Sequence, residues 1–281
     1  MATPQITLND GTTIPQLGFG VFQVPPAETE RVVTDALEVG YRHIDTAQMY
    51  GNEEGVGAAL AASGIPREEL FVTTKLNNGF HLPDDARRTM HESLERLGLD
   101  RVDLFLIHWP LPGRYDGDFV STWETLVELR ESGLSTSVGV SNFQPAHLDR
   151  IVEATGEVPA VNQIEVHPYF TNEAARAANA RHGVATEAWS PIARGRVAGD
   201  PMITEIAERL ERTPAQVTLR WHLQRGDIVF PKSLRPERMR ENWDLFGFEL
   251  EEDDMATLSS MDEGEVGRTG PNPDEFNWIP R

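Results

Sequence analysis

The feature that most constrains this chain is a regular alternation of short apolar runs with longer amphipathic stretches, which continues almost from end to end. The runs are rich in Val, Ile, Leu and Phe on both faces, which is typical of strands buried on both sides of a parallel sheet. They occupy residues 17–22, 43–46, 70–76, 102–109, 137–141, 160–166, 185–189 and 228–231. Eight strand–helix units in succession predict an α/β fold, a single (β/α)8 barrel of the TIM type.

The segments around these runs carry signals of their own. Residues 5–8 and 12–15 flank an Asp-Gly pair, which predicts a β-hairpin ahead of the barrel. Residues 83–97 have apolar side chains at helical spacing, and we expect a helix there. Thr213 followed by Pro214 and a Gln at position 216 is typical of a helix start. A further helix is expected from Pro236 through residue 246.

A doubly wound open sheet is the alternative architecture. Such a sheet usually carries Gly-x-Gly-x-x-Gly after its first strand, whereas this chain has Gly18-Phe19-Gly20-Val21-Phe22-Gln23. The barrel is therefore favoured. We find no linker or low-complexity tract, so residues 1–281 are interpreted as one domain. The Gly- and Pro-rich tail beyond Asp262 is expected to form a loop over the active-site face.

Composition limits the partners of the chain. It has no cysteine, which excludes disulfides, thiolate metal sites and a cysteine nucleophile, and we expect no bound metal. The N-terminus does not resemble a secretory signal, and the apolar runs are too short for a membrane helix. The formal net charge of −20 disfavours nucleic acid and anionic membranes. We expect a soluble, cytoplasmic protein that is monomeric.

Lysine usage is unusual, because only two of the 25 basic side chains are lysines and the others are arginines. The two are Lys75 and Lys232. An ammonium differs from a guanidinium in being compact and in having a pKa that its surroundings can tune. We therefore interpret both lysines as candidates for functional sites.

Four reactive side chains follow neighbouring strands of the predicted barrel. Asp45 and Tyr50 come after the second strand, Lys75 ends the third, and His108 ends the fourth. Active sites of such barrels lie at these C-terminal strand ends. We expect Asp45 to orient Lys75, and Lys75 to lower the pKa of Tyr50, so that the phenol protonates a carbonyl oxygen. His108 would donate a hydrogen bond to the same oxygen.

Several motifs resemble the aldo-keto reductase family, from the first hairpin to the tail. They are Asp45-Thr46-Ala47-Gln48-Met49-Tyr50, Thr74-Lys75, Leu106-Ile107-His108-Trp109-Pro110, Gly139-Val140-Ser141-Asn142-Phe143, Val161-Asn162-Gln163 and Pro231-Lys232-Ser233. Trp189 and the short tail with Gly270-Pro271-Asn272-Pro273 are most like the prokaryotic 2,5-diketo-D-gluconate reductase-like group. The resemblance implies reduction of aldehydes and ketones with NADPH, with Asp45, Tyr50, Lys75 and His108 as the catalytic residues. Compatible small-molecule substrates include keto-sugars, methylglyoxal and other α-dicarbonyls.

The resemblance also implies a cofactor site for NADPH/NADP+. The nicotinamide carboxamide would be held by Ser141, Asn142 and Gln163, while Trp189 stacks on the ring. The 2′-phosphate would be bound by Lys232, Ser233 and Arg238, and the adenine by Glu241 and Asn242. Phe22, Trp109 and Trp278 are expected to line the substrate pocket together with Tyr50.

One segment departs from the family pattern. After Trp189 the chain reads Ser-Pro-Ile-Ala and then Arg194-Gly195-Arg196, where the family usually has a glycine sooner. The pyrophosphate loop is therefore expected to differ, with Arg194 or Arg196 near the diphosphate.

Three alternatives stay open at this point. Each candidate residue has a structural explanation: Asp45 could cap a helix, and His108 could be a core histidine. The chain could also be a non-catalytic NADPH-binding regulator or sensor. Finally, the same barrel could serve a phosphosugar isomerase or lyase, which would be active without nicotinamide.

Overall fold

A computed structural model describes residues 3–280, and eight parallel strands in it form one sheet in the order β10-β9-β8-β7-β6-β5-β4-β3. Leu17 pairs with Val229, which joins the two outer strands and closes the sheet into a barrel. Gly18 N–H donates to the carbonyl of Val229 at 2.7 Å, and Val229 N–H donates to Gln16 at 3.0 Å. The predicted (β/α)8 barrel is confirmed. The strands are β3 (Phe19–Gly20), β4 (His43–Asp45), β5 (Phe71–Leu76), β6 (Val102–Ile107), β7 (Ser135–Ser141), β8 (Val161–Glu165), β9 (Ala185–Trp189) and β10 (Ile228–Val229).

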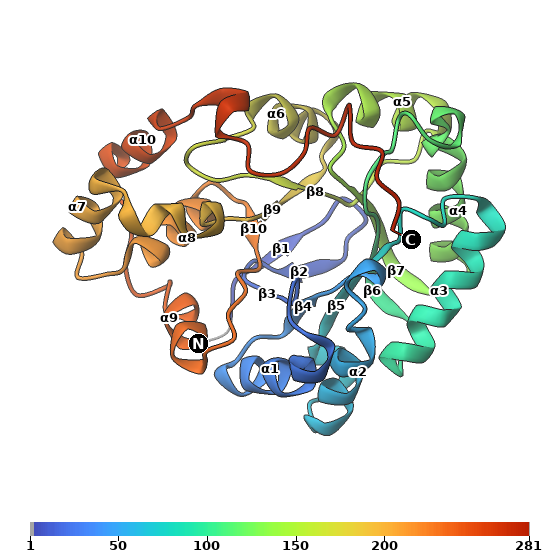
Figure 1. The fold of residues 1–281 in the computed structure, drawn as a ribbon, viewed down its shortest axis with the longest axis horizontal. Helices are drawn as coiled ribbons and strands as arrows, with labels where there is room; N and C mark the ends of the chain where they lie inside the picture. The colour runs from blue at the N-terminus through green and yellow to red at the C-terminus, as the bar shows by residue number, and fades with distance from the viewer. Residues whose placement is uncertain (1–2, 281) are drawn as a thin grey trace.

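Helices surround the strands in a ring (Figure 1). One helix follows most strands, and α7 and α10 are additional helices that pack beside α8. Within residues 3–280, none of them is both long and apolar enough to cross a membrane. The helices are α1 (Pro26–Val39), α2 (Glu53–Ala62), α3 (Pro83–Leu97), α4 (Phe119–Glu131), α5 (Pro145–Thr155), α6 (Glu173–His182), α7 (Pro201–Arg209), α8 (Pro214–Gln224), α9 (Pro236–Trp243) and α10 (Glu252–Ser260).

Local sequence signals account for many helix starts. Proline occupies the first turn of α1, α3, α5, α7, α8 and α9, where its missing N–H costs no hydrogen bond. The predicted start at Thr213 is confirmed, because Thr213 and Gln216 cap each other reciprocally. The expected end of the helix from Pro236 is wrong by three residues. Asp244 leaves the helical region with ψ at 69°, and its carbonyl instead accepts a hydrogen bond from Gln216.

The predicted hairpin, β1 (Gln5–Thr7) and β2 (Thr13–Pro15), covers the N-terminal end of the barrel. Gly11 lies in the turn at φ 86°, a conformation that costs glycine little. Leu8 and Ile14 pack against barrel residues such as Phe71 and Leu104. Full burial of one such side chain stabilises the fold by about 1.5–3 kcal/mol. The hairpin therefore seals one end of the barrel and leaves the other end for the site.

The tail crosses the C-terminal end of the barrel, as expected (Figure 1, red). After a 3₁₀ turn at Gly264–Gly267, its backbone N–H groups at Thr269 and Gly270 donate to the Glu165 carboxylate at the end of β8. Further along, Asn78 donates to the carbonyl of Trp278 at 2.9 Å. These polar contacts tie the tail to the barrel end on which the strand-end side chains lie.

Candidate active site

Lys75 is the centre of a buried polar cluster at the C-terminal end of the barrel. Its Nζ donates to Asp45 Oδ1 at 2.7 Å and Oδ2 at 2.9 Å, and to the carbonyl of Thr46 at 2.9 Å. The phenol oxygen of Tyr50 lies 3.4 Å from the same nitrogen. Lys75 is fully buried, so its ammonium has no water to solvate it and depends on these partners.

The segment that carries Tyr50 is a short 3₁₀ helix, Gln48–Tyr50, between β4 and α2. Gly51 ends it in the left-handed region at φ 66°. Gln48 accepts a hydrogen bond from the backbone of Asn77 at 2.8 Å, and Asn52 donates to the carbonyl of Val21 at 2.9 Å. The phenol is therefore fixed from both sides, by side chains that anchor the loop to neighbouring elements.

Burial shifts the pKa values of all three members of this cluster. Burial raises the pKa of Asp45 above its ordinary value, and the charge of Lys75 opposes this increase without cancelling it. For Lys75, burial lowers the pKa, but the charges of Asp45 and Tyr50 outweigh this effect and raise it above the ordinary value. Lys75 thus stays an ammonium.

The expectation that the pKa of Tyr50 falls below its ordinary value is wrong for this state of the protein. Burial raises the pKa of Tyr50, and the opposing effect of Lys75 is smaller. Lys75 acts in the expected direction, but it only limits the increase. Tyr50 is therefore a protonated phenol at neutral pH and has a proton to give.

His108 follows β6 and faces Tyr50, with ring centroids 5.7 Å apart. Burial, Lys75 and His81 hold the pKa of His108 well below its usual range, so the imidazole is neutral. Its Nδ1 is buried without a hydrogen-bond partner. Its Nε2 forms no hydrogen bond with residues 3–280 and can donate as N–H to an oxygen beside the Tyr50 phenol.

The four residues expected to hold the nicotinamide lie close together, three of them at the ends of β7 and β9 and Gln163 in the middle of β8. Asn142 has a positive φ of 63°, a conformation that asparagine tolerates. Its side-chain NH2 group donates hydrogen bonds to the His108 carbonyl and to the Ser141 hydroxyl. The indole N–H of Trp189 donates to Asn142 Oδ1 at 2.8 Å. The NH2 group of Gln163 points inward and donates to Asp45 at 2.8 Å.

The expected phosphate site lies after β10, at the start of α9. Lys232 and Arg238 are exposed there, and the Ser233 hydroxyl accepts a hydrogen bond from the Arg235 backbone. Within residues 3–280, Lys232, Arg235, Arg238 and Arg240 have no carboxylate within ion-pair distance, although the chain carries 45 acidic residues. This cationic cluster is left available for an anion.

The two expected adenine contacts, at the other end of α9, differ in their surroundings. Glu241 accepts a hydrogen bond from the Thr213 hydroxyl at 2.7 Å. Asn242 is buried, and its side chain forms no hydrogen bond with the described residues.

The segment after β9 folds into a distorted 3₁₀ helix, Ala193–Gly199. Arg194 and Gly195 have positive φ angles of 53° and 93°. Arg196 forms an ion pair with Glu263 and lies 3.6 Å above the ring of Tyr169, whereas Arg194 is exposed. Arg196 is therefore engaged with the tail, whereas Arg194 forms no ion pair with residues 3–280.

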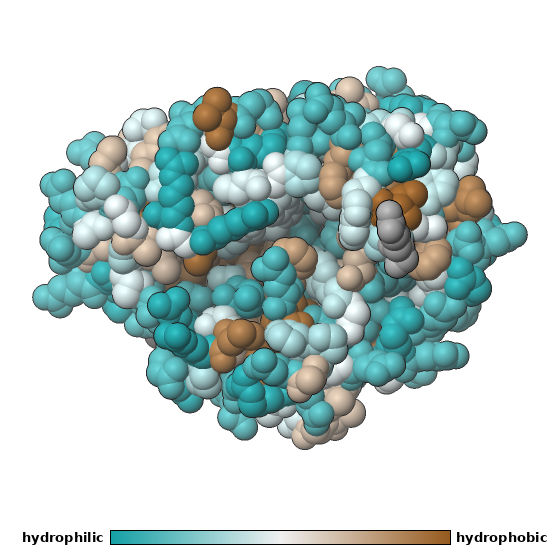
Figure 2. Space-filling view, in the orientation of Figure 1, coloured by the Kyte–Doolittle hydropathy of each residue, from teal (hydrophilic) through white to brown (hydrophobic). Residues whose placement is uncertain are grey.

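The three expected substrate-contact residues lie in loops that follow the barrel strands and in the tail. Phe22 is half exposed and its ring lies 5.1 Å from that of Tyr50. Trp109 packs on Phe276 of the tail, and Trp278 is half exposed. The same face is hollowed near its centre in Figure 2. The three aromatic side chains thus come from the β3–α1 loop, the β6–α4 loop and the tail.

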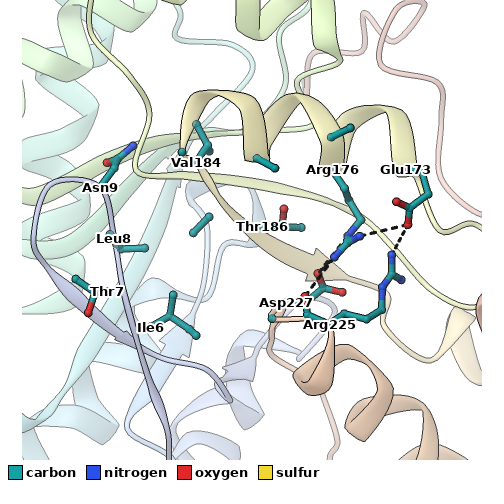
Figure 3. A pocket seen from close by; sticks show the side chains of 15 residues that line it. Ile6, Thr7, Leu8, Asn9, Glu173, Arg176, Val184, Thr186, Arg225 and Asp227 are labelled. Atoms are coloured by element: carbon teal, nitrogen blue, oxygen red, sulfur yellow. Dashed lines mark hydrogen bonds and ion pairs between the residues drawn. The ribbon is translucent and has the colours of Figure 1, made fainter. Parts of the chain in front are cut away.

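A cavity of about 440 Å³ lies at the opposite end of the barrel, between the hairpin and α6 (Figure 3). Arg176 and Arg225 reach into this region, but both are paired with Glu173, and Arg176 is also paired with Asp227. The charges therefore neutralise one another. Because none of the reactive strand-end residues lines this cavity, we do not assign the active site to it.

Sequence reasoning missed the carboxyl group of Glu187. It is fully buried in β9 and accepts a hydrogen bond from Gln163 at 2.8 Å. An acidic residue in the middle of an otherwise apolar predicted strand was the available signal. Sequence reasoning also missed Glu165, whose carboxylate binds the tail; the same signal was available there, an acidic residue inside a predicted apolar strand.

The barrel and the four reactive side chains at its C-terminal end define the class of the protein, a (β/α)8-barrel oxidoreductase. The chain belongs to the aldo/keto reductase family, whose family model matches residues 16–263.

Individual relatives cover nearly the full length. An aldo-keto reductase of Mycolicibacterium smegmatis is 50% identical over 276 residues, which is 98% of this chain and 99% of the relative. The methylglyoxal reductase DkgA of Escherichia coli is 45% identical over 279 residues, covering 98% and 99% of the two chains. A solved structure of a Gox0644 mutant in complex with NADPH is 48% identical, with a TM-score of 0.94, and covers 99% of this chain and 100% of that chain.

Proposed function

We propose that this protein reduces aldehydes and ketones to alcohols with NADPH, and that Tyr50 is the general acid. The observation that carries the proposal is the cluster in which Lys75 contacts both Asp45 and the Tyr50 phenol inside the barrel. The neutral imidazole of His108 lies beside the same phenol. A carbonyl oxygen between the two would accept hydrogen bonds from Tyr50 Oη and His108 Nε2.

The roles of the side chains follow from their charges. Tyr50 keeps its proton at neutral pH and releases it only when the carbonyl oxygen gains negative charge. The phenolate that remains faces the ammonium of Lys75, which Asp45 holds in place. His108 orients the carbonyl without needing a charge of its own. NADPH supplies the hydride when it is bound.

The residues after β7 to β10 suit this cofactor. Ser141, Asn142 and Gln163 offer amide and hydroxyl groups at the end of β7 and on β8, and Gln163 Oε1 accepts no hydrogen bond from residues 3–280. Lys232 and Arg238 are cations without acidic partners in the same range, which favours a 2′-phosphate and hence NADPH over NADH. We assign Ser233, Glu241 and Asn242 to the adenosine end, and Trp189 to the nicotinamide ring.

The substrate class is proposed from the relatives and from the rim. Relatives named methylglyoxal reductase DkgA are 45–49% identical to this chain. We therefore propose small α-dicarbonyls such as methylglyoxal, and keto-sugars such as 2,5-diketo-D-gluconate, bound among Phe22, Trp109 and Trp278. The chain acts as one domain and as a monomer, in the cytoplasm.

The test is a panel of simple aldehydes, α-dicarbonyls and keto-sugars assayed with NADPH and, separately, with NADH, by following oxidation of the cofactor. We expect turnover of several panel members, with kcat/KM highest for an α-dicarbonyl or keto-sugar and NADPH preferred. Tight NADPH binding without turnover of any carbonyl would contradict the proposal.

A further inference from the structure

A third carboxyl group lies in the barrel interior beside the Asp45–Lys75 pair. Glu187 is on β9, and its side chain is fully buried. Its Oε2 accepts a hydrogen bond from Gln163 Nε2 at 2.8 Å, while its Oε1 is buried without a partner. The proposed mechanism gives this residue no part, and a buried acid with a free oxygen requires an explanation.

Gln163 links this carboxyl to the proposed catalytic residues. Its single NH2 group has two hydrogens, and it donates one to Asp45 Oδ2 and one to Glu187 Oε2, both at 2.8 Å. Because both neighbours are carboxyl acceptors, the amide is fixed with its nitrogen inward. Gln163 Oε1 is then left as the free acceptor that the proposed cofactor carboxamide would use.

The charges around Glu187 are few. The titratable groups that face it inside the barrel are Asp45 and His43 on β4 and Lys75 on β5, and neighbouring β8 contributes the neutral Gln163. Burial holds the pKa of His43 down at about 3, and its Nε2 is 3.8 Å from Glu187 Oε1, beyond hydrogen-bond distance. Lys75 therefore supplies the one positive charge, and Asp45 already neutralises it.

A second carboxylate at this place would be a buried anion without a counter-charge, which is strongly unfavourable. The pKa of Glu187 agrees with this argument, since burial, followed by the charge of Asp45, raises it to about 8. At neutral pH the group is thus a carboxylic acid.

We propose that Glu187 is a positioning residue that is held as a neutral acid. It fixes the orientation of Gln163, and because it carries no charge it allows Tyr50 to become a phenolate when it gives up its proton. The proposal rests on the proposed function. In that reaction the Tyr50 O–H bond breaks, its proton forms the alcohol O–H, and its electron pair stays on Tyr50, while the carbonyl carbon gains the hydride of NADPH. With Glu187 neutral, the cluster carries one net negative charge after this step; with Glu187 ionised it would carry two.

The experiment compares wild type with Glu187→Gln, which keeps the shape and an acceptor oxygen but stays neutral at every pH. In wild type, kcat for carbonyl reduction should fall about tenfold as pH rises from 7 to 9, because Glu187 ionises. In Glu187→Gln that fall should disappear. The matched control is Glu53→Gln, which replaces a buried carboxyl group that lies outside the barrel and is paired with Arg96. This variant should still show the fall in kcat between pH 7 and 9.

A second readout uses the protein without cofactor. The pKa of Glu187 is higher in the folded protein than its ordinary value of 4.5, so the native state binds more protons between about pH 4.5 and 8. Stability from this group is complete below that window and decreases as pH rises through it. The fall in Tm from pH 6 to 9 should therefore be steeper in wild type than in Glu187→Gln.

A wild-type measurement makes the proposal independent of whether the variant folds. The infrared band of a protonated carboxyl should be present at pH 7 and lost by pH 9. Absence of this band at pH 7, or the same pH profile and Tm slope in wild type and Glu187→Gln, would overturn the proposal. If no carbonyl is reduced by either protein, the proposed function fails, while the infrared band still decides the protonation of Glu187.

Discussion

Lys75 Nζ lies 3.4 Å from the phenol oxygen of Tyr50, and it is the cation that opposes the effect of burial on that phenol. Asp45 accepts a hydrogen bond from the same ammonium at 2.7 Å and helps to hold it in place. The acid strength of Tyr50 is thus a balance between burial and one buried positive charge.

Replacing Lys75 by Met should remove that charge and raise the pKa of Tyr50 further. We expect kcat to fall by about 10²–10⁴-fold, the usual contribution of a positioned general acid. Because Asp45 would be left as an unpaired buried charge, the variant should also lose roughly 3–5 kcal/mol of stability. The double variant Lys75→Met/Asp45→Asn separates the two effects: its Tm should recover while its kcat stays low. Recovery of kcat in the double variant would contradict the role of Lys75.

The cluster at the start of α9 should decide between NADPH and NADH. Lys232→Ala and Arg238→Ala should each raise the Kd of NADPH by about 10–100-fold, since a charge-assisted hydrogen bond contributes roughly 1.5–3 kcal/mol. The Kd of NADH should change little. The control is Arg101→Ala, which removes one exposed positive charge near the opposite end of the barrel. The Kd values of all variants are measured by fluorescence titration at one fixed ionic strength. Equal losses for both cofactors would rule out a 2′-phosphate contact.

Gly270 of the tail should be sensitive to substitution, because a Cβ there would collide with the ring of Trp189. Gly270→Ala should displace either the tail or the indole, and we expect a weaker NADPH affinity and altered tryptophan fluorescence. Gly199→Ala places its Cβ in open space and should behave as wild type. If Gly270→Ala binds NADPH unchanged, Trp189 does not form part of the nicotinamide site.

Buried histidines predict a loss of stability in acid. Burial lowers the pKa of His43 to about 3 and that of His81 to about 4, and it also lowers those of His108 and His222. These neutral histidines stabilise the fold fully above their pKa in the unfolded chain, which is about 6.5. As pH falls below this value the unfolded chain takes up protons first, so the stabilisation is lost as pH approaches the lower pKa values of the folded protein. Tm should therefore fall between pH 6.5 and 5. Replacing the exposed His91 by Gln should not change that slope, whereas a Tm independent of pH in this range would contradict neutral burial.

Much of the fold could be predicted from the sequence because it depends on local signals. The apolar runs, the first-turn prolines and the Thr213–Gln216 cap are each visible in a few adjacent residues. Boundaries were less accurate: β10 is only Ile228–Val229, and α9 ends at Trp243 where Asp244 turns to bond Gln216. That bond joins residues far apart in sequence, so no local pattern contains it.

The candidate site could be predicted in part for a related reason. The rule that strand ends converge placed Asp45, Lys75 and His108 at one end of the barrel. The same rule does not say how deeply the Tyr50 phenol is buried, and it is this burial that reverses the expected pKa shift of Tyr50. It also could not reveal Glu187, because the bridge through Gln163 exists only after the barrel closes.

The role of Tyr50 is tested most directly by the variant Tyr50→Phe, which removes one hydroxyl and leaves the Asp45–Lys75 pair in place. Carbonyl reduction and NADPH binding should be measured on the same preparation. We expect kcat to fall by at least about 10²–10⁴-fold, with the Kd of NADPH unchanged. Turnover by Tyr50→Phe at the wild-type rate would contradict the central claim that Tyr50 supplies the proton.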